Sequence, residues 1–271
     1  MPVQVIKNLS VFAMNRSLKL YLDKLVSVLS DELNGMLHSV MLFGSAAYGA
    51  YEPGLSDVDV QAVIVRPLEP ADYRRLAEKI SHKAIPCPAR KLEFVLYTKE
   101  NAAQRSRNPH HEMNFNTGKC MEEDYVSLNS TEDRHWFLLD IASGIDLGVA
   151  LYGPEPKEVF AQPRLDWVFE CLLESVAWHV SNEASSPNSV LNACRGLRFA
   201  ETGHWGSKVE GAAWALERYS GYPAVKEARD ARHHNEAVTR DEALEFLKFA
   251  ESEIQRLRAE KITDDTPQQT P

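Results

Sequence analysis

Apolar residues in the first hundred positions recur at helical spacing and then at the spacing of strands. Those between Leu18 and Leu33 recur every three or four residues, which predicts a helix over about residues 15–36. Short apolar runs predict buried strands at 39–43, 58–65 and 91–97, and an amphipathic pattern predicts a helix at 70–82. A loop rich in small residues, 44–56, separates the first two strands. This order describes a compact α/β unit with a mixed sheet.

The pattern changes after residue 100. Residues 101–133 are polar without a clear period and are predicted to form a long excursion over a substrate cleft. Helical patterning returns over 135–151 and is broken by the sequence Gly-Pro-Glu-Pro at 153–156. From Arg164 onward the pattern is helical throughout, with capping boxes that start at Ser207 and Thr239. The predicted fold class is therefore α+β, a mixed-sheet domain followed by an all-α helical bundle. The expected boundaries are 1–155 for the first domain, 156–262 for the helical domain and 263–271 for a disordered tail.

Composition narrows the possible partners. The chain has 271 residues and a formal net charge of −9, which argues against a broad basic surface for nucleic acid and suits a cationic or neutral small substrate. The four cysteines form no CxxC pair and are expected to be reduced thiols in a cytoplasmic protein. Neither a leader peptide nor an apolar run of membrane-spanning length is recognisable, so no membrane partner is expected. The oligomeric state is left open.

Two carboxylates carry the first sign of chemistry. Asp57 and Asp59 lie two residues apart at the start of a predicted strand, and alternate strand residues point to the same face. Carboxylate oxygens, together with phosphate and water, suit octahedral Mg²⁺. The pair therefore predicts a magnesium site, with two ions expected.

Small polar residues precede the carboxylates. Gly44 and Ser45 follow a strand directly, and a glycine there lets backbone N–H groups approach a phosphate. The hydroxyl of Ser45 adds a donor, and Ser56 is a candidate for another. A nucleotide triphosphate would then lie between this turn and the metal.

A third carboxylate, Glu93, interrupts the apolar strand at 91–97. A charge in such a strand costs stability unless it faces solvent or a metal. Glu93 is therefore a candidate third metal ligand, or the base that removes a proton from an attacking hydroxyl. Each of these features alone has an ordinary explanation, such as an exposed strand face or a common turn. Their joint order favours a nucleotide site.

With these residues in place, the sequence resembles the polymerase-β-like nucleotidyltransferases. The stretches 43–49 and 55–59 resemble their signature, and more narrowly that of the aminoglycoside (3'')(9) adenylyltransferases, which modify streptomycin and spectinomycin. Further matches are 146–154, 190–195 and 203–215, so the resemblance covers most of the chain.

The resemblance implies a reaction and a set of roles. In that family AMP passes from ATP to a hydroxyl, with substrates between the two domains. The two Asp residues bind Mg²⁺, the strand Glu is the proposed base, and an Arg and a Lys of the helical domain contact ATP phosphates. Carried over, the last two roles fall on Arg195 and Lys208. Cations there would stabilise the charge that spreads over phosphate oxygens.

The acceptor side departs from the family. Members that accept streptomycin have a Trp after the Glu strand, and 112–118 has none. Acidic residues that receive the cationic antibiotic precede the Arg-bearing helix, whereas 184–188 holds none. Spectinomycin is therefore favoured over streptomycin. Two alternatives stay open: the same chemistry on a protein or RNA acceptor, and a nucleotide-binding module without catalysis.

Other residues suit structural interpretations. The pairs His110-His111 and His233-His234 are predicted in solvated loops or helix ends, and the acidic run 122–124 on a solvated face. Three tryptophans in apolar patterns are predicted to be core residues, while Trp205 is left between the core and the cleft. The three are Trp136, Trp178 and Trp214.

Overall fold

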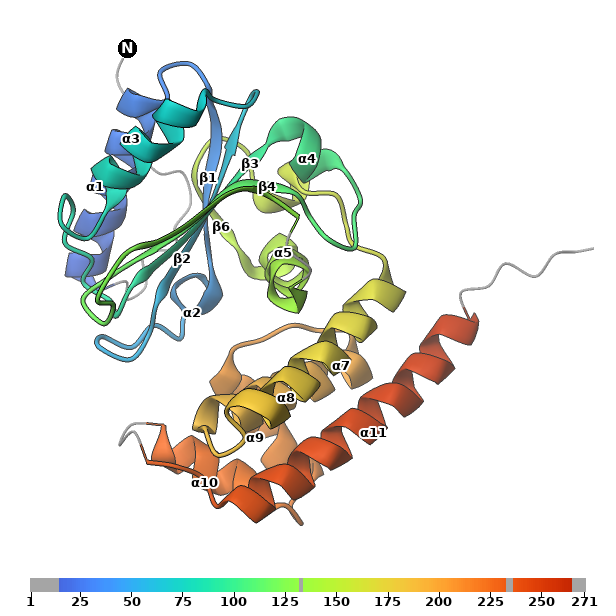
Figure 1. Ribbon diagram of the computed structural model, residues 1–271. Coiled ribbons are helices and arrows are strands. Elements are labelled where there is room, and N and C mark those ends of the chain that lie inside the picture. Colours follow the sequence, from blue (N-terminus) through green and yellow to red (C-terminus); the bar gives the residue numbers. More distant parts are fainter. Residues whose placement is uncertain (1–14, 132–133, 233–235, 265–271) are drawn as a thin grey trace, which may run out of the picture. The chain divides into compact units, whose positions relative to one another are not determined.

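The computed structural model describes residues 15–131, 134–232 and 236–264 (Figure 1). The chain divides into two compact units, Met1–Gln162 and Pro163–Pro271. The first carries a sheet, and the described part of the second is helical. The division falls shortly after the predicted boundary at residue 155, because the single-turn helix α6 (Pro156–Val159) still packs against the first unit.

Unit 1 is built on a six-stranded mixed sheet with the order β5-β4-β3-β2-β1-β6. Strands β2 and β3 are parallel, and every other neighbouring pair is antiparallel. The strands are β1 (Leu37–Phe43), β2 (Val58–Ile64), β3 (Leu92–Thr98), β4 (His111–Thr117), β5 (Tyr125–Ser130) and β6 (Val149–Tyr152). The predicted mixed sheet is confirmed.

Helices cover both faces of this sheet (Figure 1). On one face, α1 (Arg16–Glu32) and α3 (Pro70–Ile80) pack over Val58 and its alternate neighbours in β2. On the other face, α5 (His135–Leu147) and the short α4 (Lys99–Ala103) cover Phe43 and alternate residues of β2 and β3. The side chains of β2 thus alternate between two cores, as the strand period requires.

The segment predicted as a polar excursion contains two strands, so that prediction was wrong. Strand β4 is almost wholly buried although it carries His111 and Glu112. The Glu112 carboxylate accepts hydrogen bonds from the Tyr73 hydroxyl at 2.7 Å and from the Asn101 amide at 3.1 Å. Such partners satisfy polar side chains inside a buried strand. The sequence of this strand therefore lacks the alternation of apolar and polar residues that would predict it. The placement of His111 also corrects its prediction as a solvated loop residue, because its ring is fully buried and lies 4.6 Å from the ring of Phe137.

Two further elements differ from expectation. The predicted helix over 135–151 ends at Leu147, and its last residues form β6, which pairs with β1. A run of four apolar residues is too short to distinguish the helical period from the strand period. In the predicted loop after β1, residues Gly44–Ala47 form a single helical turn, α2.

Unit 2 is helical in its described part, as predicted, and this part contains five helices. They are α7 (Leu165–Asn182), α8 (Pro187–Thr202), α9 (Lys208–Arg218), α10 (Pro223–Ala231) and α11 (Arg240–Asp264). The capping box predicted at Ser207 is present, with reciprocal bonds to Glu210 of 3.2 and 2.7 Å. At the other predicted box, the backbone N–H and hydroxyl of Thr239 donate to Glu227, both at 3.0 Å. Helix α11 reaches into the predicted tail, of which 265–271 lie outside the described residues, as do His233 and His234.

Three tryptophans predicted in the core lie nearer the surface than expected, and Trp205 lies in the core. Trp136, Trp178 and Trp214 are only half-buried, whereas Trp205 is buried and stacks on Phe199 with ring centroids 4.0 Å apart. Amphipathic patterns therefore located the helix faces but not the depth of these large side chains.

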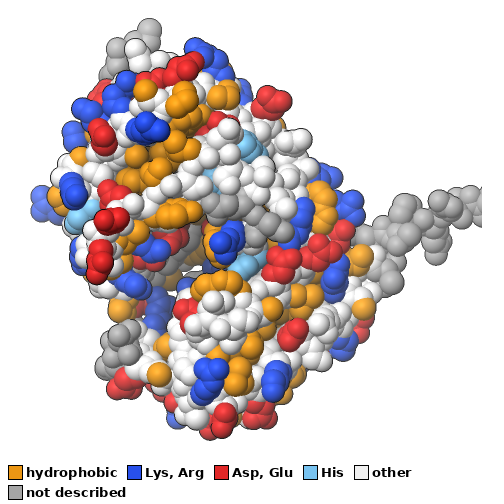
Figure 2. Space-filling model, viewed as in Figure 1, with side chains coloured by type: hydrophobic (Ala, Val, Ile, Leu, Met, Phe, Trp, Pro, Cys, Tyr) orange, Lys and Arg blue, Asp and Glu red, His pale blue; other side chains and the backbone are white. Residues whose placement is uncertain are grey.

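Charges of both signs lie on the surface, and the cysteines form no disulfide. Lys and Arg side chains are interspersed with Asp and Glu over the face seen in Figure 2. All four cysteines are free thiols, and three of them are buried. Within the described residues, no helix combines the length and the apolar character needed to cross a membrane.

Candidate active site

Asp59 lies where three strands bring candidate residues together. In the sheet it is paired with Phe43, the last residue of β1, and in the parallel direction with Glu93 of β3. Gly44 follows Phe43 immediately and has a left-handed φ of 60°. A Cβ at this position would overlap the carboxylate of Asp59. The sheet register therefore sets Gly44, Asp59 and Glu93 side by side.

Burial and neighbouring carboxylates act together on Asp59. Burial raises the pKa of Asp59 well above its ordinary value, and the charges of Glu93, Asp140 and Asp57 raise it further. A hydrogen bond between the carboxyls of Asp59 and Glu93 adds to the effect. Asp140 comes from α5, which covers this face of the sheet, so three other acidic side chains influence Asp59. Such crowding of like charge costs free energy unless a proton or a cation joins the group.

Lys91 supplies a cation at this position. Its ammonium forms an ion pair with the Glu93 carboxylate. Burial lowers the pKa of Lys91, but the charges of Glu93, Asp57 and Asp59 outweigh it and raise the pKa above the usual value. A backbone hydrogen bond ties the start of β2 to the residue before β3, because the Val58 N–H donates to the Lys91 carbonyl at 3.0 Å. Lys91 is thus a charged neighbour of the three carboxylates singled out in the sequence.

The two serines have different surroundings. Ser45 lies in the turn α2 and is half-buried, and its carbonyl accepts from the Ala50 N–H at 2.9 Å. Ser56 is buried, and its hydroxyl accepts from the backbone N–H of Glu52 at 3.0 Å. This bond closes the loop before β2. Phosphate contacts by either hydroxyl stay predictions, and the contact of Ser56 gives it a role in shaping the loop.

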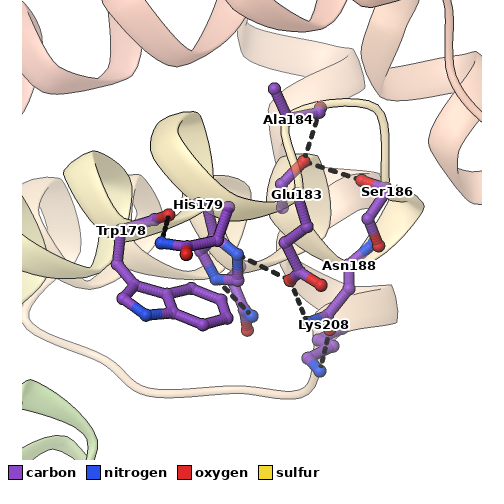
Figure 3. A network of polar contacts seen from close by, with 10 residues as sticks. Trp178, His179, Glu183, Ala184, Ser186, Asn188 and Lys208 are labelled. Carbon is purple, nitrogen blue, oxygen red and sulfur yellow. Dashed lines mark hydrogen bonds and ion pairs between the residues drawn. The ribbon is translucent and has the colours of Figure 1, made fainter.

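Arg195 and Lys208 both belong to unit 2 and lie close to one buried histidine. Arg195 is on α8 and Lys208 begins α9, where its ammonium donates to the Asn188 side chain (Figure 3). Burial lowers the pKa of His179, Glu183 raises it, and the charges of Lys208 and Arg195 lower it again. The structure therefore gathers the two predicted phosphate-binding cations into one electrostatic neighbourhood.

Comparisons with protein families agree with the division of the chain into two units. Residues 22–115 match the nucleotidyltransferase domain, and residues 163–255 match the C-terminal domain of aminoglycoside adenylyltransferase. The chain therefore combines a nucleotidyltransferase domain with a segment that matches the C-terminal domain of aminoglycoside adenylyltransferase. It is an enzyme of the nucleotidyltransferase class. Among curated proteins, no sequence matches it.

Solved structures are similar to this chain to different degrees. One is the spectinomycin adenyltransferase AAD(9) from Enterococcus faecialis with ATP and spectinomycin, at 15% identity and a TM-score of 0.67, covering 88% of this chain and 99% of that one. A toxin-antitoxin with AMP-PNP covers 60% of this chain and 93% of that chain at 14% identity, with a TM-score of 0.29. The tri-AMPylated Shewanella oneidensis HEPN toxin in complex with MNT antitoxin covers 61% and 92% at 13% identity, with a TM-score of 0.27.

Three charged residues near the candidate sites were not singled out in the sequence. Lys91 is two positions before Glu93, Asp140 lies on a separate helix, and Glu183 comes just before the stretch 184–188 that lacks acidic residues. The strand period could have identified Lys91, because it puts residues 91 and 93 on the same face. Asp140 gains significance only from tertiary contacts, whereas Glu183 lies four positions after His179, at the spacing of one helical turn.

The carboxylates do not form a ready-made cage. Across the described ranges, no group of three or more His, Cys, Asp or Glu side chains is arranged to hold a metal ion. Mg²⁺ is usually bound by one or two carboxylates together with water and substrate phosphates. The crowded carboxylate of Asp59 suits that form of binding, in which the nucleotide completes the coordination.

Proposed function

We propose that this enzyme transfers AMP from ATP to a hydroxyl group of an aminocyclitol or aminoglycoside. The observation that carries the proposal is the sheet register. It pairs Asp59 with Glu93 and with Phe43, the last residue of β1, so that Gly44 lies against the Asp59 carboxylate. This arrangement joins a candidate metal ligand, a candidate base and a glycine turn on neighbouring strands. It matches the requirements of phosphoryl-group chemistry, which depends on positioning and on stabilisation of charge.

The proposed reaction is one displacement at the α-phosphorus of ATP. The acceptor hydroxyl oxygen bonds to that phosphorus, the bond to the bridging oxygen breaks, and pyrophosphate leaves. Glu93 receives the hydroxyl proton, because a neutral alcohol is a weak nucleophile. The backbone of Gly44 and Ser45, together with the cations of Arg195 and Lys208, binds phosphate oxygens. The products are the adenylylated acceptor and pyrophosphate.

Mg²⁺ is assigned to Asp57 and Asp59, with phosphate oxygens as further ligands. When bound, the metal offsets the negative charge of the phosphates. Two observations support the assignment. The carboxylates of Glu93, Asp140 and Asp57 add to burial in raising the pKa of Asp59, so negative charge is concentrated there, and Gly44 leaves no side chain between that carboxylate and the turn. Glu93 is held by Lys91 and is assigned to proton transfer ahead of metal binding.

The acceptor class rests on unit 2 and on a solved relative. Residues 163–255 match a domain of aminoglycoside adenylyltransferase, and the fold is similar to that of an enzyme crystallised with ATP and spectinomycin. A net charge of −9 suits a cationic acceptor. Since 112–118 holds no Trp, spectinomycin is proposed ahead of streptomycin.

A product assay tests the proposal. The protein is incubated with ATP, Mg²⁺ and either spectinomycin or streptomycin, and the antibiotic is analysed by mass spectrometry while pyrophosphate is measured. We expect the mass of one added AMP on spectinomycin and an equal amount of pyrophosphate. Absence of adenylylated product with both antibiotics would remove the antibiotic part of the proposal.

The matched control is Asp59→Asn, which changes the charge and keeps the shape. It should abolish product formation with any acceptor that the wild-type protein modifies. Full turnover by this variant would show that the metal and nucleotide site has been assigned to the wrong residues.

A further inference from the structure

A directional chain of polar contacts leads to Lys208 (Figure 3). The Asn192 amide nitrogen lies 3.0 Å from Nε2 of His179, and Nδ1 of His179 lies 2.8 Å from Oε1 of Glu183. The same oxygen of Glu183 accepts a hydrogen bond from the Asn188 amide nitrogen at 3.1 Å. The Asn188 oxygen in turn accepts from the Lys208 ammonium.

The donors and acceptors of this chain are mutually consistent. Burial lowers the pKa of His179, which favours the neutral ring with one donor and one acceptor nitrogen. Nδ1 then lies at ion-pair distance from the Glu183 carboxylate, at 2.8 Å, and Nε2 accepts from the Asn192 amide. Because the amide nitrogen of Asn188 is bound to Glu183, its oxygen faces Lys208. The orientation of each side chain is therefore fixed by the next.

Helical backbone supports this series of polar contacts at both ends. His179 lies in the last turns of α7 and is buried, and Asn188 lies in the first turn of α8. The Ser186 side chain caps α8 by accepting from the Asn188 N–H at 3.2 Å. Ser189 closes the turn between the helices, with its hydroxyl 3.0 Å from the Ala184 carbonyl. The contact with Lys208 thus starts from an ordered connection between two helices.

Lys208 is the member that needs such support. The Lys208 side chain has four rotatable bonds, and ordering them on ligand binding costs conformational entropy. A contact that forms before the ligand binds reduces that cost. An ammonium group can make three hydrogen bonds, so the contact with Asn188 is compatible with contacts to phosphate oxygens. Capping by Ser207 fixes the backbone from which the side chain extends.

We propose that the chain His179–Glu183–Asn188 is a positioning device that holds the Lys208 ammonium in place for the phosphates of ATP. The inference rests on the proposed function, in which Lys208 binds those phosphates. It gives a role to the stretch 184–188, which lacks the acidic residues of the family: Asn188 acts through Lys208. Asn188 and Glu183 are positioning residues and need not touch either substrate.

A double-mutant cycle tests this inference. ATP binding to the full-length protein is measured by calorimetry for wild type, Asn188→Leu, Lys208→Met and the double variant. Asn188→Leu preserves size and removes both hydrogen bonds. We expect it to weaken ATP binding about tenfold, as one charge-assisted hydrogen bond is lost, and to have no further effect in the Lys208→Met background. Where turnover is measurable, the KM for ATP should rise more than kcat falls.

Two further variants keep the test independent of folding. Asn182→Leu removes the neighbouring bond from the Asn182 amide to the Trp178 carbonyl, which is 2.8 Å long and is not part of the chain, so ATP binding should stay at the wild-type level. Glu183→Gln retains an oxygen acceptor at Glu183, and its effect should be smaller than that of Asn188→Leu. Thermal unfolding of each variant shows that the helices remain folded.

The outcomes separate this inference from the proposed function. If Asn188→Leu weakens ATP binding equally with and without Lys208, the residue does not act through Lys208 and the inference is overturned. If Lys208→Met binds ATP as tightly as wild type, the phosphate role of Lys208 fails, and the positioning role fails with it. Loss of the Asn188→Leu effect in the Lys208→Met background supports the inference.

Discussion

A Cβ atom added to Gly44 would overlap the carboxylate of Asp59, and the left-handed φ of 60° at Gly44 disfavours any side chain there. Gly44→Ala should therefore displace Asp59 or the turn that follows β1. We expect at least a hundredfold loss of kcat/KM, because displacements near 1 Å have effects of about that size. The free energy of unfolding should fall by about 1–3 kcal/mol. Turnover and urea denaturation measure the two effects.

Gly49→Ala is the matched control. Gly49 lies in the same loop with a φ of 72°, but a Cβ there would have no heavy atom within 4 Å. It carries the conformational cost of about 1 kcal/mol without the steric overlap. Equal losses of activity in the two variants would show that backbone strain, and not the approach to Asp59, decides the result.

Asp59→Asn should abolish activity while stabilising the metal-free protein at alkaline pH. Burial and the neighbouring charges raise the pKa of Asp59 above its ordinary 3.8, so the folded chain holds this proton more tightly than the unfolded chain. The associated stability is present below the ordinary pKa and is lost as the pH rises through the raised pKa. Asparagine cannot titrate, and the variant avoids that loss. Melting of the metal-free proteins should differ by about 2–4 °C near pH 8.

At about pH 4 the two proteins should melt at nearly the same temperature, because most of the wild-type Asp59 is then protonated. Addition of Mg²⁺ with ATP should stabilise wild type and leave the variant unchanged. A wild-type protein that gains stability on going from pH 4 to 8, relative to the variant, would contradict the direction of the shift.

How far the sequence predicts this site depends on whether a contact lies within one strand period or between distant elements. The strand patterns located Asp57 and Asp59 around the start of β2 and placed Glu93 in a further strand, now β3. The pairing of Asp59 with Glu93 needs the register of two strands that α3 separates, which no local pattern specifies. Asp140 joins the group only because α5 packs over the same face of the sheet.

The missed strands have a related physical cause. In β4 the polar side chains are buried and satisfied by partners such as Tyr73, so polarity along the chain does not indicate exposure. In β5 the exposed edge of the sheet carries Tyr125 and Val126 among polar neighbours, which gives no apolar stripe. Sequence patterns indicate a strand when one face is buried and the other is solvated. Neither strand meets this condition, because β4 is almost wholly buried and β5 is largely exposed.

Lys91→Met should impair catalysis more than ATP binding. The ion pair of Lys91 with Glu93 fixes the candidate base and offsets the charge of the surrounding carboxylates. Without the cation, we expect kcat to fall about tenfold, within the range for a misplaced general base, while the KM for ATP changes little. Lys91→Arg keeps the charge and should retain more of the rate. Steady-state kinetics with saturating acceptor distinguishes the two parameters.

Lys79→Met is the control for this substitution. Lys79 also faces a glutamate, Glu32 at 3.8 Å, but the two lie on α3 and α1, on the opposite layer from the Asp140 helix. Exposed pairs of this kind contribute little, so kcat should remain at the wild-type level. If Lys91→Met behaves like Lys79→Met, the ion pair with Glu93 has no part in catalysis.

Gly211→Ala should weaken ATP binding by separating two helices of unit 2. A Cβ at Gly211 of α9 would lie 2.9 Å from both Cα and N of Arg195 on α8, and backbone atoms cannot rotate away. The variant should lose about 1–3 kcal/mol of stability despite the better helix propensity of alanine. Gly196→Ala in α8 is the control, since its Cβ would meet only the ends of two side chains, Leu172 Cδ2 at 3.2 Å and Ile254 Cδ1 at 3.8 Å. Because α9 also carries Lys208, calorimetry should show weaker ATP binding for Gly211→Ala than for Gly196→Ala. Equal binding by the two variants would mean that the close packing of α8 and α9 does not set the spacing of the two cations.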